Sequence, residues 1–85
     1  SCISVQRILV HQSIAAAFRD ALVAQITSSI RAGDPADRST VVGPMINAAA
    51  RDKVVGWIED ARAQGARLLT PLHLSDPSLL GPVLL

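Results

Sequence analysis

Apolar residues early in the chain repeat with the period of an α-helix. They stand at every fourth position, at Ile14, Phe18, Leu22, Ile26 and Ile30. This spacing predicts a helix with one core-facing side, because residues four apart lie on the same face. Ser13 is the expected N-cap, and Gly33 with the following Asp34-Pro35 is expected to end the helix.

A second helix is predicted between Asn47, a favourable N-cap, and Gly65, a favourable C-terminal stop. Its apolar positions predict an inner face made of Val54, Val55, Ile58 and Ala61, with Trp57 at the edge. Its charged positions are expected to face solvent, at Arg51, Asp52, Glu59, Asp60 and Arg62. The segment 33–46 between the helices carries two Pro and two Gly and is expected to be an ordered loop.

Three short stretches rich in aliphatic residues predict strands. They are residues 6–11, 66–70 and 83–85, and a turn-rich connector over 71–82 separates the last two. The order strand-helix-helix-strand, followed by the start of another strand, predicts an α/β fold with a partly parallel sheet. This sheet is expected to have open edges, because a strand buried on both faces needs more sheet and helix around it than 85 residues supply.

Composition and charge exclude several classes of protein. Apolar residues occupy 49% of the positions, which is too many for a disordered segment. A net charge of +1, with one Trp, one Phe and no Tyr, argues against nucleic-acid binding. No apolar run is long enough to cross a membrane, and no secretory signal is visible. A single cysteine rules out an internal disulfide and fits a reducing compartment, which we expect to be the cytoplasm.

The two ends favour a piece of a larger protein. The chain starts with Ser1 rather than Met and stops on the apolar run 83–85, whereas free termini are usually polar.

Candidate chemistry is confined to a few side chains. Cys2 is the single thiol, and its position alone leaves two interpretations open, a small buried hydrophobic side chain or an activated nucleophile. His11 and His73 have no other ligands at metal-binding spacing, so no metal site is expected. Lys53, taken alone, is interpreted as a solvated surface lysine.

The segment from Ser1 to His11 resembles the segment around the catalytic cysteine of the aldehyde dehydrogenase superfamily. The resemblance continues in order through the helix with Phe18, the Gly-Asp-Pro at 33–35 and the Val-Gly-Pro-Met-Ile at 42–46. It then includes the helix over 54–61 and the Gly-Ala-Arg-Leu-Leu at 65–69, and it becomes loose from 71 to 81. The resemblance implies that residues 1–85 are part of a catalytic domain, a single incomplete domain without the cofactor-binding domain.

The resemblance also implies roles for two residues. Cys2 falls on the family's nucleophile, whose thiolate attacks the aldehyde to give a thiohemiacetal. After hydride transfer to the nicotinamide of NAD or NADP, water hydrolyses the resulting thioester. The Cys2 backbone N–H falls on an oxyanion donor, and Lys53 falls where some members place a basic side chain near the nicotinamide ribose.

By the same resemblance, the general-base glutamate, the side-chain amide of the oxyanion hole and most of the cofactor site are expected outside these residues. The isolated chain is therefore expected to be inactive. The parent protein is expected to be a homo-oligomer that acts on a small-molecule aldehyde.

Two other functions stay open. Unpaired strand edges and an apolar face suit a small α/β interaction or oligomerisation module, and self-association of the isolated chain is expected for the same reason. A redox sensor using Cys2 has no resolving cysteine in this chain, so it would form only mixed or intermolecular disulfides.

Overall fold

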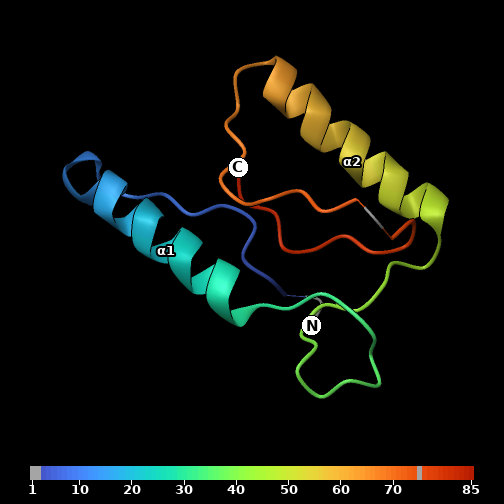
Figure 1. Ribbon diagram of the computed structural model, residues 1–85. Helices are drawn as coiled ribbons and strands as arrows, with labels where there is room; N and C mark the ends of the chain where they lie inside the picture. Colours follow the sequence, from blue (N-terminus) through green and yellow to red (C-terminus); the bar gives the residue numbers. More distant parts are fainter. Residues whose placement is uncertain (1–2, 75) are drawn as a thin grey trace.

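The computed structural model describes residues 3–74 and 76–85 (Figure 1). Their regular elements are a 3₁₀ turn, η1 (Gln12–Ile14), and two α-helices, α1 (Ala15–Ser29) and α2 (Ala48–Ala63). The two helices lie apart, and the C-terminal arm, defined as residues 66–74 and 76–85, runs beside α2 (Figure 1). The radius of gyration, 14.0 Å, exceeds the value of about 12 Å for a compact domain of this length, so the arrangement is open.

The second helix agrees with the sequence prediction at both ends. The Oδ1 atom of Asn47 accepts the Ala50 N–H at 2.8 Å, which satisfies one of the donors that a first helical turn leaves unpaired. Gly65 follows the helix with a φ of 103°, a left-handed conformation that glycine adopts without steric cost. Ile58 on the predicted inner face is buried. Local capping signals therefore place α2 correctly.

The first helix forms where predicted, but the predictions for its ends are wrong. Ser13 lies in η1, where its N–H donates to the Nδ1 atom of His11 at 3.1 Å, so His11 caps this 3₁₀ turn. The N-cap residue of α1 is Ile14, which makes no side-chain cap bond. The helix ends at Ser29, several residues before Gly33. The backbone is already extended at Ile30, and the Gly33 N–H donates to the Val42 carbonyl at 3.0 Å, outside the helix.

The apolar stripe on α1 does not form a closed core. No residue of α1 is buried, and Phe18 is 39% exposed. The best-buried side chains of the described residues are Ile58, Arg51 and Thr70, so burial is centred between α2 and the C-terminal arm.

The predicted strand-helix-helix-strand arrangement with a sheet is wrong for residues 3–74 and 76–85, which contain no strand longer than an isolated bridge. A strand forms only when a neighbour completes its hydrogen bonds, whatever the preference of its side chains. In the predicted first strand, residues 6–11, every residue is exposed except Val10, which is half-buried. The bridge is a parallel pair between Ala32 and Val42.

The other two predicted strands lie side by side without forming a ladder. The Leu69 N–H donates to the Leu84 carbonyl at 2.9 Å. The Leu84 N–H then donates to Thr70 Oγ1 at 3.0 Å rather than to a backbone carbonyl, so the pairing stops after one backbone bond.

The loop between the helices is ordered by its own polar residues, as predicted. The Asp34 carboxylate accepts the Ala36 N–H, and the Asp37 carboxylate accepts the Ser39 N–H, both at 2.8 Å. These are side-chain turns of the kind that Asp commonly forms.

Candidate functional site

The predicted nucleophile, Cys2, lies outside the described residues, as does its backbone N–H. The chain that follows it is exposed through Leu9 and turns into η1 at His11. Both roles assigned to Cys2 therefore stay predictions that rest on the sequence.

Lys53, the predicted cofactor contact, lies on the exposed surface of α2. Its Nζ atom stands 5.3 Å from the centroid of the Trp57 ring, one helical turn further along, and Trp57 itself is 60% exposed. A cation over an aromatic face at an exposed site contributes about 0.5–1 kcal/mol, so the ammonium remains available to another partner.

A dinucleotide needs partners for its ribose hydroxyls and its phosphates. Lys53 can donate to a ribose hydroxyl, because its ammonium is exposed. The first turn of α2, where a phosphate could otherwise meet free N–H groups, is capped by the Asn47 side chain. Asn47 thus occupies one N–H of this turn, that of Ala50, and the Lys53 ammonium one turn later is exposed.

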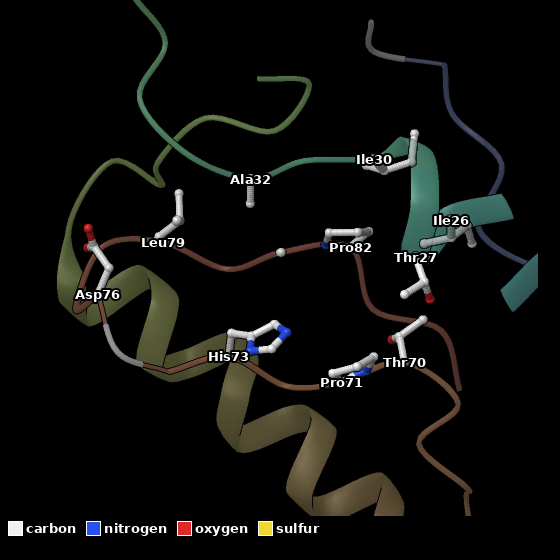
Figure 2. Close-up of a pocket in the computed structure, with 11 residues that line it drawn as sticks. Ile26, Thr27, Ile30, Ala32, Thr70, Pro71, His73, Asp76, Leu79 and Pro82 are labelled. Carbon is white, nitrogen blue, oxygen red and sulfur yellow. The ribbon is translucent and has the colours of Figure 1, made fainter. Parts of the chain in front are cut away.

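A cavity of about 320 Å³ lies between the end of α1 and the C-terminal arm (Figure 2). Apolar side chains make most of its wall, from Ile26, Ile30, Ala32, Pro71, Leu79 and Pro82. Its polar side chains come from Thr27, Thr70, His73 and Asp76. In Figure 2 the His73 ring points across the cavity toward Pro82. Thr70 is buried and uses its hydroxyl to accept the Leu84 N–H, so it is committed to holding the arm.

Asp76 closes a turn at the edge of this cavity. Its Oδ1 atom accepts the Ser78 N–H at 2.9 Å and the Ser78 hydroxyl at 3.0 Å. These hydrogen bonds, with a smaller contribution from the positive charge of Arg51, hold the pKa of Asp76 below its ordinary value. A carboxylate that stays ionised in this way stabilises the turn and is poorly suited to donate a proton.

Arg51 is the side chain that the sequence analysis placed wrongly. It was expected to face solvent, but it is only 8% exposed, and its guanidinium donates to the carbonyls of Leu74 and Leu79. The signal was present, because Arg51 precedes Val54 and Ile58 at helical spacing and so belongs to the same inner face. The charge of the side chain indicates exposure, but its position on the helix correctly indicates burial.

Two negative findings concern the part of the chain that the structure describes. No group of three or more His, Cys, Asp or Glu side chains there could hold a metal ion. Neither α1 nor α2 is long and apolar enough to cross a membrane.

Comparison with known proteins identifies the family. The sequence model described as "Aldehyde dehydrogenase family" matches residues 1–85, and the chain therefore belongs to the aldehyde dehydrogenase family. This finding confirms the resemblance noted in the sequence.

Individual relatives agree with this assignment. The chain is 40% identical over 84 residues to a vanillin dehydrogenase of Pseudomonas fluorescens, a match that covers 99% of this chain and 17% of the relative. It is 43% identical over 67 residues to a betaine aldehyde dehydrogenase of Brucella anthropi, covering 79% of this chain and 14% of the relative. A betaine aldehyde dehydrogenase of Brucella ovis is 45% identical over 67 residues with the same coverage. The chain thus spans about a sixth of the length of these relatives. No solved structure matches it.

Proposed function

We propose that residues 1–85 are part of the catalytic domain of an NAD(P)-dependent aldehyde dehydrogenase and that Cys2 is its nucleophile. The observation that carries this proposal is the family match, which extends over the whole chain and includes the position of Cys2. The named relatives act on two different aldehydes, vanillin and betaine aldehyde, so the proposed substrate class is an aldehyde of unspecified side chain.

In the proposed reaction, the Cys2 thiolate forms a bond to the carbonyl carbon of the aldehyde. The Cys2 backbone N–H donates to the carbonyl oxygen as negative charge develops there. When bound, NAD or NADP would accept the hydride that leaves this carbon, which converts the thiohemiacetal into a thioester on Cys2. Water then hydrolyses the thioester on Cys2, which releases the carboxylic acid and restores the thiol.

Lys53 is proposed to contact the dinucleotide at its ribose. Its exposure and the weak Trp57 contact support this role, since little interaction energy is lost when the ammonium changes partner. Replacing Lys53 with Ala is expected to raise the KM for the dinucleotide and to leave kcat nearly unchanged. Arg62→Ala is the control, because Arg62 is another exposed cation of α2 whose partner is Glu59 at 3.1 Å. Equal KM values in the two variants would remove Lys53 from the cofactor site.

We also propose that the full-length protein is cytoplasmic and works as a homo-oligomer. The first of these proposals rests on the cysteine content of these 85 residues alone, which fits a reducing compartment. The second is supported by the exposed apolar side chains described below for the alternative function.

The experiment that tests the main proposal uses the full-length gene product. Reduction of NAD and NADP is measured with vanillin and with betaine aldehyde, for the unchanged protein and for Cys2→Ser. The serine variant keeps the size of the side chain but loses the nucleophilic thiolate, so its rate is expected to fall at least about a thousandfold. A Cys2→Ser protein with undiminished activity would refute the proposal. The isolated 85 residues are expected to be inactive.

A second function is favoured by the exposed apolar surface. Leu9 and Ile46 are each 91% exposed, and a groove of about 920 Å³ runs beside Phe18, Leu22 and Ile58. Such a surface is typical of an interaction or oligomerisation module. Self-association of the isolated chain is therefore expected, and light scattering over a range of concentrations measures it. A dimer that persists in Cys2→Ser would show that packing, and not a disulfide, holds the copies together, whereas a monomer at high concentration would contradict this function.

A further inference from the structure

Arg51 makes three connections from an almost fully buried position near the start of α2. Its Nη2 donates to the Leu74 carbonyl at 3.0 Å, and its Nε donates to the Leu79 carbonyl at 3.4 Å. Its Nη1 donates to the Asp52 carboxylate at 2.9 Å. A single side chain therefore connects α2 to two points of the C-terminal arm.

This arrangement meets the physical requirement of a buried cation. Removing a guanidinium from water is costly unless its donors find acceptors, and here each of the three bonds uses a different nitrogen. The Asp52 carboxylate is 66% exposed, so it balances the positive charge of Arg51 from the protein surface. The two backbone carbonyls accept from the buried nitrogens of the guanidinium. The planar fork of arginine can serve several acceptors at once, whereas a lysine ammonium is a single point of charge.

The arm has few other attachments. The Met45 N–H donates to the Ser78 carbonyl at 2.7 Å and joins the arm to the loop before α2, whereas the bonds of Leu69 to Leu84 and of Leu84 to Thr70 lie within the arm. The described stretches 71–74 and 76–82 contain no helix or strand, and the hydrogen bonds of the turn at Asp76 join only neighbouring residues, Ser78 and Leu79. Their position therefore depends on contacts with the rest of the chain.

We propose that Arg51 is the anchor that holds the C-terminal arm against α2, and that the cavity beside α1 exists only while this anchor is made. The two anchored carbonyls, of Leu74 and Leu79, lie next to cavity-lining residues or belong to them. Leu79 and His73 line the cavity from two neighbouring segments of the arm, and in Figure 2 the Leu79 side chain points toward Ala32. When the anchor is lost, this wall moves away from α1. The role is one of positioning and is independent of the function proposed for Cys2.

Amide hydrogen exchange of the full-length gene product tests the anchor. The informative amides are those of Met45, Leu69 and Leu84. The acceptor of each amide is an atom of the arm, and Leu69 and Leu84 themselves belong to the arm. In Arg51→Met, which keeps an apolar stem but removes every donor, these amides are expected to exchange roughly 10- to 100-fold faster. Arg51→Lys keeps the charge near Asp52 but cannot reach both carbonyls, so an intermediate increase is expected.

The matched control is Arg62→Met, which removes an exposed arginine from the same helix. It is expected to leave the exchange of the three amides unchanged. Unchanged exchange in Arg51→Met would overturn the proposal, and so would a uniform increase that extends through α1. If Arg51→Met does not fold, Arg51→Lys alone tests the proposal. Exchange of the three amides in Arg51→Lys at the same rates as in the unchanged protein would then refute the anchor.

Discussion

The cap of α2 offers a sharp test of how local sequence positions a helix. Asn47→Ala removes the Oδ1 acceptor that lies 2.8 Å from the Ala50 N–H and leaves that donor without its side-chain partner. Loss of an N-cap typically costs about 1 kcal/mol. Local opening of the first turn should therefore become roughly fivefold more frequent. The Arg51 N–H keeps its bond to the Asn47 carbonyl, since the substitution leaves the backbone in place.

The matched control is Ser13→Ala, because Ser13 has the same sequence signature of a cap and a different role in the structure. Its hydroxyl contacts the His11 ring at 2.8 Å and caps no helical N–H. Removing it should change stability by less than about 0.5 kcal/mol. Asn47→Asp keeps a carboxylate acceptor at the positive end of the helix and should preserve the protection of Ala50.

Hydrogen exchange of the full-length gene product measures all three variants. The Ala50 amide is expected to exchange fastest in Asn47→Ala. In Ser13→Ala and Asn47→Asp its exchange rate should stay close to that of the unchanged protein. Equal rates in Asn47→Ala and Ser13→Ala would refute the reasoning, because the side-chain bond would then contribute nothing to the helix start.

Further predictions concern glycines, the buried centre and pH, and chemical denaturation of the full-length product checks each of them. Gly65→Ala should cost about 1–2 kcal/mol, because φ is 103° there, whereas Gly56→Ala in the open interior of α2 should gain up to about 1 kcal/mol. Ile58→Ala should cost about 2–5 kcal/mol, since this side chain is buried, and a smaller loss would mean that the site collapses around the alanine. Hydrogen bonds from the N–H and hydroxyl of Ser39 lower the pKa of Asp37 below 3.8. The stability from these bonds is therefore complete above that pH and is lost as the pH falls through the folded-state pKa; Asp37→Asn should remove this acid-side slope.

The parts of the fold that sequence predicted well are those determined within a few residues. Asn47 caps a turn that lies beside it, and Gly65 supplies its own unusual φ angle, so neither depends on distant chain. The predicted strand at 6–11 failed for the opposite reason. Its aliphatic side chains favour extended backbone, but no sequence pattern provides the neighbouring strand that would complete its hydrogen bonds.

Polar residues with two possible uses were harder to predict. The helical spacing of Arg51 with Val54 and Ile58 indicates burial, whereas its charge indicates exposure. The side chain is buried because carbonyls of the arm, distant in sequence, accept its hydrogen bonds. Ser13 was the expected N-cap of the first helix, but in the structure the His11 imidazole caps the 3₁₀ turn in which Ser13 lies. For the candidate site, Cys2 was identified by its resemblance to a known family, since one thiol carries no spacing from which a role can be worked out.

The central claim, that Cys2 is the nucleophile of an aldehyde dehydrogenase, is tested most directly by trapping the acylated enzyme. The full-length gene product is mixed with vanillin or betaine aldehyde and a dinucleotide, quenched in acid during turnover, digested and analysed by mass spectrometry. The account predicts that the peptide containing Cys2 gains the mass of the acyl group, and that Cys2→Ser shows no such gain. Turnover with the acyl group on another residue, or with no acylated peptide at any quench time, would contradict it.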